Sequence, residues 1–415
     1  MAHTRRTMRW ISALSNHSDL PTAVDEATRD IVDALEGSTP DLVVAFVSEH
    51  HRSEYPTLPP LVRNRLGDPV LIGCSAGGVI GACHESESES AVALTAAVLP
   101  GTDLAPFWLD RSLMPYSGAP TPVWEKALGV ATSADPSFIL MGDPYSFDTE
   151  QLLPVLDRMF PASPKVGGLA SGAERAGEVA LFLNDQTYRS GMVGLALSGS
   201  VTMSTIVAQG CRPIGEPLFV TGLDGTTLTG LDGQPPLVAL RNVLSGLSTQ
   251  DQELAGHSLL AGIAMEPAQQ PYARGDFVIR NITALDTDSG RLQISARLRE
   301  NSIVQFHLRD AKTSTEELED LLRAYRRDVN QATPVGGLLF SCLGRGRHLY
   351  GVEGHDSGLF HDLLGDIPLS GFFGNGEIGP VHGETFLHGY TSAFGLFSPS
   401  ERAHSGSRNA PIRAE

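Results

Sequence analysis

The sequence predicts an α/β fold in which repeated βαβ units form mixed sheets, beside an antiparallel meander, in two lobes. Three stretches of the chain share one strand–helix–strand pattern, and each stretch ends in a glycine-rich turn. After Gly275 the pattern changes to short segments in which apolar and polar residues alternate, as they do along half-buried strands. With 415 residues, 41% of them hydrophobic, the chain is long enough for about two domains with ordinary cores.

The three copies of the βαβ unit keep a common register. The first copy spans residues 41–78, and a shift of 94 residues aligns it with residues 135–172, where Gly73 meets Gly167. The third copy spans residues 337–377. Internal repetition constrains a fold more strongly than a single motif does. We therefore expect strand pairs joined by right-handed crossover helices.

Periodicity places the elements of the N-terminal half. Residues 19–35 predict a helix, because apolar residues such as Ala23 and Ala27 recur every four positions. The polar run Glu85–Ser90 predicts an exposed turn. The other elements predicted here are strands at 10–14, 41–46, 69–72, 92–99, 178–183 and 191–197, a helix at 58–66, and a hairpin at 218–234.

The C-terminal half begins with a helix that Pro236 opens and that runs to Leu247. Residues 313–328 predict a second helix, because Thr and Ser precede two glutamates at its start. The antiparallel meander is predicted from alternating segments at 277–282, 291–295 and 302–308, and further strands are predicted at 259–265 and 386–397.

These elements divide the chain into an N-terminal region, residues 10–235, and a C-terminal region, residues 236–397. Residues 398–415 are polar and rich in Ser and Arg, so we expect a disordered tail there.

Composition argues against several partners. The formal net charge is −18 and the isoelectric point is about 5.1, a field that repels nucleic acid and anionic membranes, so we expect neither as a partner. No apolar run of about 18 residues predicts a membrane helix. The four cysteines have no C-x-x-C spacing, and the apolar run of an export signal does not follow Arg5 and Arg6. We therefore expect free thiols and a cytoplasmic location.

One motif suggests a hydrolase. Residues Gly73–Gly77 match G-x-S-x-G, the nucleophile elbow of α/β hydrolases, with Ser75 or Cys74 as nucleophile. Asp143 and His388 would complete a triad in the usual chain order. However, the residues after Ser75 do not predict the helix that an elbow requires, and the other two copies lack this serine. We assign no catalytic residue and keep the hydrolase as an alternative function.

Glycine-rich turns after strands can also bind a ligand. Their backbone N–H groups hold phosphate or carboxylate groups, so Ser75 and Gly77 are candidate ligand contacts, although glycine can also serve the turn alone. No turn has a complete dinucleotide fingerprint, so we expect no cofactor of that kind. We also expect no metal site, because the side chains of His50 and His51 point apart.

The most unusual segment is Gly371–Pro380, with the sequence GFFGNGEIGP. Asn375 and Glu377 lie there among glycines, and Cys342 and Arg345 follow the preceding strand, so we expect these four side chains to line one cavity. Arginine binds carboxylate and glutamate accepts hydrogen bonds from ammonium, which suggests a ligand with both charges, such as an amino acid. Alternatively, Arg345 and Glu377 pair with each other or face solvent, and Cys342 is a small buried residue.

We expect this cavity to belong to the C-terminal lobe alone. Gly77 and Ser171 lie in the other predicted region, so Gly77, Ser171 and Asn375 should not all share one cavity.

Six segments together resemble the FIST family, named for F-box and intracellular signal transduction proteins. They are Ser12–Ser15, Asp41–His51, Gly73–Gly78, Gly275–Ile282, Gly344–Arg347 and Gly371–Pro380. The resemblance extends over an N-terminal and a C-terminal FIST region. It implies a cytoplasmic protein that senses small ligands, amino acids among them, and it implies no established catalytic residue.

The resemblance also implies a signalling protein as a partner, because members of the family often carry kinase, cyclase, chemotaxis or F-box modules. No such output domain accompanies the two regions here, so we expect signalling to be indirect. A protein–protein adaptor without a small ligand is the third function that the sequence leaves open.

Overall fold

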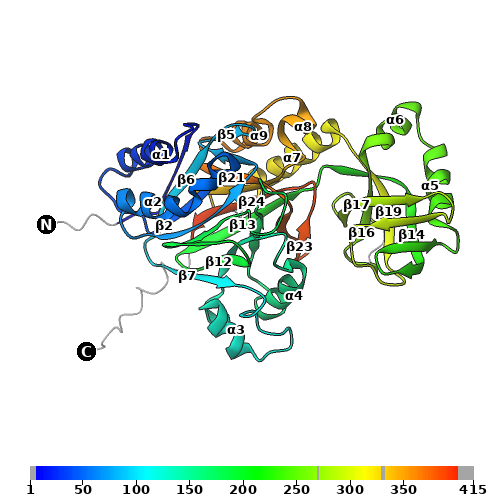
Figure 1. Cartoon of the computed structure of the whole chain (residues 1–415), viewed down its shortest axis with the longest axis horizontal. Helices are drawn as coiled ribbons and strands as arrows, with labels where there is room; N and C mark the ends of the chain where they lie inside the picture. The colour runs from blue at the N-terminus through cyan, green and yellow to red at the C-terminus, as the bar shows by residue number, and fades with distance from the viewer. Residues whose placement is uncertain (1–5, 269–270, 329–331, 401–415) are drawn as a thin grey trace, which may run out of the picture. The chain divides into compact units, whose positions relative to one another are not determined.

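The computed structural model describes residues 6–268, 271–328 and 332–400, and the chain divides into two compact units (Figure 1). Unit 1 consists of Met1–Val207, Leu322–Leu387 and Ser392–Glu415, and unit 2 consists of Ala208–Leu321 and His388–Thr391. Unit 1 contains all three copies of the βαβ repeat. The units are therefore a different division of the chain from the two regions predicted on either side of residue 235.

Within its described residues, unit 1 contains three six-stranded sheets. Sheet 1 has the order β1 (Arg9–Ser15), β6 (Val92–Val98), β2 (Leu42–Ser48), β3 (Val70–Ala76), β10 (Leu181–Leu183), β11 (Gln186–Tyr188). Sheet 2 has the order β7 (Thr102–Leu109), β12 (Met192–Gly199), β8 (Ser137–Gly142), β9 (Lys165–Leu169), β22 (Glu377–Val381), β23 (Glu384–His388). Sheet 3 has the order β13 (Val201–Ala208), β24 (Ser392–Pro399), β20 (Gly336–Cys342), β21 (Leu369–Gly374), β4 (Gly78–Gly81), β5 (His84–Ser86).

The three sheets exchange hairpins in a cycle. In each sheet, two strands are the parallel pair of one copy of the repeat, and two more come from the chain around that copy. The last two strands are a hairpin that follows another copy. Hairpin β10–β11 of the second copy completes sheet 1, β22–β23 of the third copy completes sheet 2, and β4–β5 of the first copy completes sheet 3. Each copy therefore depends on another copy for a complete sheet. Parallel pairs such as β2–β3 and antiparallel pairs occur together, which confirms the predicted mixed α/β sheets.

One glycine occupies the same place in each copy. Gly73 lies opposite Ala45 in the pair β2–β3, Gly167 opposite Leu140 in β8–β9, and Gly371 opposite Leu339 in β20–β21. A Cβ atom on these glycines would lie 1.9, 1.8 and 1.7 Å from the carbonyl oxygen of the opposite residue. Only glycine fits so close to a neighbouring backbone, so the repeat explains these three glycines structurally.

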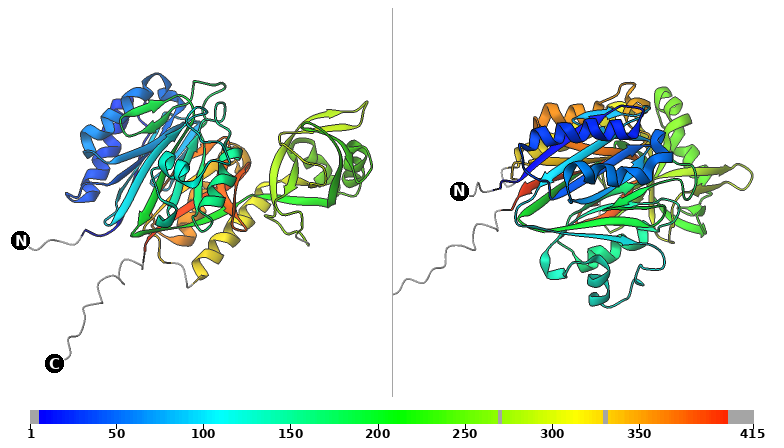
Figure 2. Two further views of the ribbon diagram at one scale, coloured as in Figure 1. Left: turned by 90° about the horizontal axis from the view of Figure 1, so that it is seen from below. Right: turned by 60° about the vertical axis from the view of Figure 1, so that its left-hand side comes forward.

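Strand β2 shows how the layers of unit 1 form. Leu42, Val44 and Phe46 pack into the core that the three sheets share, while Val43 and Val47 pack on the helix side. Because side chains alternate along a strand, a strand buried on both faces is apolar throughout. The helices on the outer sides of sheets 1 and 2 are visible in Figures 1 and 2. They are α1 (Leu20–Leu35) and α2 (Leu58–Leu66) on sheet 1, and α3 (Thr121–Leu128) and α4 (Thr149–Met159) on sheet 2.

Aromatic side chains join the sheets at the centre of unit 1. Phe46 of sheet 1 lies 5.1 Å from Phe372 and 6.4 Å from Phe340 of sheet 3, measured between ring centroids. Phe340 and Phe372 are in edge contact at 5.6 Å. On the outer side of sheet 3, Phe360 of α9 (His355–Leu364) stacks on Phe394. Such pairs stabilise a core by about 0.5–1.5 kcal/mol beyond their buried area.

Unit 2 is a closed antiparallel barrel, in the order β14 (Cys211–Asp224), β15 (Thr227–Leu231), β18 (Arg291–Ile294), β17 (Phe277–Asp286), β16 (Leu259–Ala264), β19 (Ile303–Arg309). Helices α5 (Pro236–Ser245) and α6 (Thr249–Ser258) belong to the same unit. The predicted meander holds for β17 and β18. Strand β19 instead pairs with β14 and β16, because closure of the barrel places this fully buried strand between them.

Several predicted elements differ from the structure. The strand predicted at 386–397 is two strands, β23 and β24, separated by residues 389–391. The polar run at 85–90 is not simply an exposed turn, since Glu85 is buried in β5. Helix α7 (Ala311–Arg327) matches its prediction closely. The predicted tail begins within β24, and its residues 401–415 lie outside the described residues.

Candidate functional site

The glycine turns of the three copies meet at one place in unit 1, which we call the turn junction. It consists of residues 75–78, 169–172 and 373–376, at the carboxyl ends of β3, β9 and β21. The glycines Gly73, Gly167 and Gly371 are the shared tight glycine of each copy. Counted from this glycine, Gly77, Ser171 and Asn375 are equivalent positions. Ligands of α/β proteins bind at this end of parallel strands.

Backbone hydrogen bonds join the turns in pairs. The Asn375 amide donates to the Leu169 carbonyl over 3.0 Å, and the Ser171 amide donates to the Ser75 carbonyl over 3.3 Å. The two contacts are equivalent, because each runs from the fourth residue after the shared glycine of one copy to the second residue after that of another copy.

The third contact runs through a side chain. The Ser171 hydroxyl accepts a hydrogen bond from the Gly77 amide over 2.8 Å and donates one to the Phe373 carbonyl. Ser171 is buried, and its hydroxyl closes the cycle of contacts around the junction.

We expected Asn375 to lie in a different lobe from Gly77 and Ser171, and that premise is wrong. All three belong to unit 1, and hydrogen bonds link their turns directly. The cause is the hairpin exchange, which interleaves sequence regions that local patterns treat as independent.

The six candidate ligand contacts surround the turn junction at different depths. Asn375 is exposed, and Cys342 and Gly77 are half-buried. The other three, Ser75, Arg345 and Glu377, are buried. Cys342 pairs with Gly374, one residue before Asn375, so both lie at one end of sheet 3. The structure thus brings these residues to one region but leaves only part of the set at the surface.

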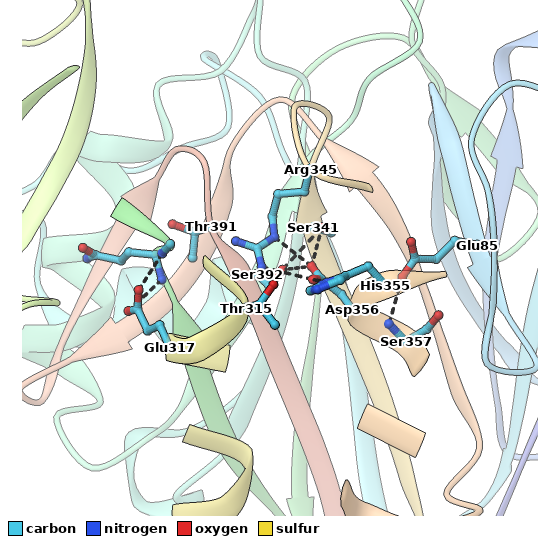
Figure 3. Close-up of polar contacts among 12 residues, drawn as sticks. Glu85, Thr315, Glu317, Ser341, Arg345, His355, Asp356, Ser357, Thr391 and Ser392 are labelled. Atoms are coloured by element: carbon cyan, nitrogen blue, oxygen red, sulfur yellow. Dashed lines mark hydrogen bonds and ion pairs between the residues drawn. The ribbon is translucent and has the colours of Figure 1, made fainter. Parts of the chain in front are cut away.

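Arg345 lies in a buried polar cluster in unit 1 (Figure 3). Its Nε donates to Oδ2 of Asp356 over 2.7 Å, and its Nη2 donates to Oδ1 over 3.1 Å. The hydroxyl groups of Ser341 and Ser392 also donate to Asp356, and so does Nδ1 of His355, over 2.9 Å. Asp356, at the start of α9, is therefore the common acceptor of the cluster. Arg345 therefore pairs with this carboxylate.

The other two copies of the repeat have no equivalent cluster of serines. At the same register, the paired residues are Val47 and Val92 in the first copy, Gly142 and Met192 in the second, and Ser341 and Ser392 in the third. Since the same strand pair forms without these hydroxyl groups twice in this chain, the fold alone does not require them.

Electrostatics hold Asp356 ionised. Burial alone would raise the pKa of its carboxyl, but the Arg345 charge and the hydrogen bonds from His355, Arg345 and Ser392 outweigh burial and hold the pKa well below its usual range. The His355 ring stacks on Tyr350 at 3.4 Å, and the Arg345 guanidinium lies 5.6 Å from the Tyr350 ring. Because the pair of Arg345 and Asp356 is buried, removal of only one of the two charges costs a large amount of folding free energy.

Glu377 is a second departure from the repeat. It lies in β22 at the place where the exchanged hairpin faces the residue after the shared glycine. The residues at this place in the other sheets are Leu181 and Val79. A buried carboxyl therefore occurs once where an apolar side chain occurs twice. Buried charges carry a large desolvation cost and cluster at functional sites.

Glu85 belongs to the same region and was missed from the sequence. Its carboxylate, on β5, accepts hydrogen bonds from the Ser357 amide over 2.8 Å and the Gly354 amide over 3.1 Å, at the start of α9. Burial, together with the nearby Asp356 charge, raises the pKa of Glu85 to about 7. The alternating Glu and Ser residues around it gave no signal, because its partner α9 is far away in sequence.

The geometry around Ser75 is not a nucleophile elbow. Ser75 and Cys74 lie inside β3, and strand β4 follows where an elbow requires a helix. The Ser75 hydroxyl accepts a hydrogen bond from the Ala180 amide over 3.0 Å and is fully buried. Burial raises the pKa of the Cys74 thiol well above its usual value, which disfavours the reactive thiolate.

Among residues 6–268, 271–328 and 332–400, no group of three His, Cys, Asp or Glu side chains has the arrangement of a metal site. In the same residues, no helix is long and apolar enough to cross a membrane.

Comparison with known proteins decides the family. Residues 41–234 match the FIST N domain, and residues 236–380 match the FIST C domain. The chain belongs to the FIST family. FIST domains are linked to sensing in signal transduction.

The FIST chain is similar to several other proteins. It is 38% identical over 390 residues to the uncharacterized protein Rv0628c of Mycobacterium tuberculosis, covering 94% of this chain and 100% of the relative. It is 36% identical over 380 residues to the uncharacterized protein Mb0898c of Mycobacterium bovis, covering 91% and 96%. Human F-box only protein 22 is 30% identical over 141 residues, which cover 34% of this chain and 32% of that protein.

Among solved structures, cyanuric acid hydrolase from A. caulinodans has 8% sequence identity and a TM-score of 0.32, over 95% of this chain and 100% of that chain. This likeness is too low to carry an argument about function.

Proposed function

We propose that this FIST protein is a sensor-like protein of the cell interior that binds a small ligand at the turn junction. The observation that carries this proposal is the set of polar residues by which the third copy differs from the other two. Asn375, the buried pair Arg345 and Asp356, and Glu377 all belong to the third copy, and all lie at or beside the place where the three turns meet. Polar groups that the fold does not require are best explained by a ligand.

The depth of the residues suggests their roles. Asn375 is exposed. Its side-chain amide donates to the Ala170 carbonyl over 3.4 Å, so its second N–H and its amide oxygen are the groups placed for contact with a ligand. Cys342 and Gly77 form the surface beside it. Arg345 and Glu377 lie beneath and support the turns. Glu377 is the buried acid nearest Asn375 in sequence.

An amino acid is the ligand class that suits this arrangement. The ligand ammonium would lie toward the acidic side of the junction, while its carboxylate accepts from the Asn375 amide and from backbone N–H groups of the glycine turns. A direct clamp between Arg345 and the ligand carboxylate is disfavoured, because Arg345 is fully buried and Asp356 already accepts two hydrogen bonds from its guanidinium. We therefore assign the first contact to Asn375 rather than to Arg345.

The surroundings of Ser75 and Cys74, the nucleophiles of the alternative hydrolase function, also fit a binding protein. Ser75 is a hydrogen-bonded strand residue, and Cys74 has a raised pKa in a buried position. No specific observation favours a hydrolase over a binding protein.

A thermal-shift screen with amino acids and small carboxylates, run beside a generic ester assay, tests the proposed function. We expect at least one amino acid to raise the melting temperature and no ester turnover that depends on Ser75. Ester hydrolysis that Ser75→Ala abolishes would favour the hydrolase. A complete lack of thermal shift at millimolar ligand would favour the adaptor.

A further inference from the structure

A pocket of about 450 Å³ lies in unit 1, apart from the turn junction. Its walls are Trp10–Ser12 of β1, the turn Ala82–His84 of the exchanged hairpin, Gly358 and His361 of α9, and the loop Asp366–Pro368. Its volume lies within the range of about 300–1,000 Å³ that is typical of small-molecule sites. None of the candidate ligand contacts at the junction lines this pocket.

The turn that forms one wall has an unfavourable backbone. Ala82 and Cys83 both have positive φ angles, of 47° and 60°, between β4 and β5. The equivalent hairpin turns of the other copies place Asn184, or His382 and Gly383, in this left-handed region. Asn and Gly suit that conformation, whereas Ala and Cys adopt it at a cost of about 1 kcal/mol or more each.

Contacts to two other walls hold this turn in place. The Ala82 amide donates to the Ser12 hydroxyl over 2.8 Å, and the Cys83 thiol donates to the Ile367 carbonyl over 3.7 Å. The pocket is therefore built by residues from three segments that restrain one another. Strained backbone that is held in place by the surrounding structure clusters at active sites and ligand sites. The strained turn at Ala82 and Cys83 therefore suggests that this pocket has a function.

The polar groups of the pocket set the chemistry of its ligand. Nδ1 of His84 lies 2.8 Å from the Ala82 carbonyl, which can only accept, so Nδ1 carries a proton. Nδ1 of His361 lies 3.4 Å from the Asp366 carboxylate. The Asp366 carboxylate is therefore an acceptor at the edge of the pocket, and a ligand with N–H or O–H groups matches it.

The charge and the apolar lining of the pocket narrow the class of ligand further. The lining contains the Asp366 carboxylate and no Lys or Arg, and the whole chain carries a net charge of −18. An anionic ligand is therefore disfavoured. The remaining surface is mainly apolar, from Trp10, Ile11, Ile367 and Pro368, which suits a flat ring.

We propose that this pocket binds a small aromatic molecule that is neutral or cationic and carries an N–H or O–H donor. The site is independent of the ligand site proposed at the turn junction, and either one can fail without the other.

Alkylation of Cys83 by iodoacetamide, followed by mass spectrometry, tests this site in the full-length chain. Indole, tryptamine and indole-3-acetate serve as probes, because they share a ring and differ in charge. We expect millimolar tryptamine and indole to slow the alkylation of Cys83 and indole-3-acetate to protect it at least about tenfold more weakly. N-acetylcysteine alkylated under the same conditions is the control, because its rate reports any direct effect of the probes on the reagent.

Two glycine variants make a matched pair for the same measurement. A Cβ atom on Gly358 in α9, or on Gly256 in α6, would meet no other atom within 4 Å. Gly358→Leu adds a side chain at the pocket wall and removes a helical glycine, so we expect a stable protein that loses most of the protection. Gly256→Leu should retain the protection of Cys83 by indole and tryptamine.

Three results would overturn the proposal. They are equal rates of Cys83 alkylation with and without indole and tryptamine, stronger protection by indole-3-acetate than by tryptamine, and unchanged protection in a folded Gly358→Leu protein.

Discussion

The hydroxyl oxygen of Ser171 accepts a hydrogen bond from the backbone amide of Gly77 over 2.8 Å. The two residues occupy the same position in two copies of the repeat, and the same hydroxyl donates to the Phe373 carbonyl in the third copy. One side chain thus connects all three copies at the turn junction.

Replacement of Ser171 by alanine should destabilise the protein. The variant removes both hydrogen bonds of the hydroxyl and leaves the Gly77 amide without its acceptor. The expected loss in the free energy of unfolding is about 1–3 kcal/mol, measured by urea denaturation. Ser133→Ala, at an exposed position of unit 1, should change the free energy by less than about 0.5 kcal/mol. Equal stabilities of the two variants would refute the role of Ser171.

The shared tight glycine should be essential in every copy. Alanine at Gly73, Gly167 or Gly371 would bring Cβ within 1.9 Å of a carbonyl oxygen, so each substitution should cost more than about 3 kcal/mol. We expect three variants with low soluble yield and low melting temperature. Gly358→Ala, in open space on a helix, should be neutral or stabilising. A variant of normal stability at any of the three positions would contradict the structural equivalence of the copies.

The sequence predicts much of the local structure because local structure follows periodicity. Helix α2 has the predicted bounds of residues 58–66, and α1 begins after Asp19, whose side chain accepts from the Thr22 amide as an N-cap does. The repeat register of Gly73 and Gly167 also holds. The exchange of hairpins could not be predicted, because short strands such as β4 and β10 have the same pattern whichever sheet they join.

The buried pair of Arg345 and Asp356 should behave as a coupled unit. Arg345→Met or Asp356→Leu alone leaves one charge buried without its partner, which should cost about 3–5 kcal/mol. The double variant removes both charges, so it should be less destabilised than the sum of the single variants. A double-mutant cycle by chemical denaturation measures this coupling. Additive effects would show that the two side chains do not depend on each other.

Glu85 should give the stability of the protein a distinct pH dependence. Because its pKa is raised from 4.5 to about 7 by burial and the Asp356 charge, the folded protein binds more protons than the unfolded chain in that window. The free energy of unfolding should therefore fall as the pH rises from about 5 to 8, by at most about 3 kcal/mol from this group.

The matched comparison uses Glu85→Gln against Glu89→Gln, an exposed neighbour. Glu85→Gln should lose this part of the slope, while Glu89→Gln should retain it. Identical slopes in both variants would show that Glu85 is not the group responsible.

The candidate site was only partly predictable from sequence. Asn375, Glu377, Cys342 and Arg345 stand out as polar residues near strand ends, and the structure brings them to one region. The partner of Arg345 was not predictable, because Asp356 lies in a polar stretch without a distinctive pattern. The depth of each side chain was also not predictable, since burial at the junction depends on turns from other copies.

Calorimetric titration with a panel of amino acids tests the central claim that a small ligand binds at the turn junction. Wild type and Asn242→Ala, an exposed control on α5, should bind at least one amino acid with the same dissociation constant. Asn375→Ala should bind the same amino acid at least about tenfold more weakly, a loss of about 1.4 kcal/mol or more. The absence of binding to wild type at millimolar concentration, or equal affinity in Asn375→Ala, would contradict the account.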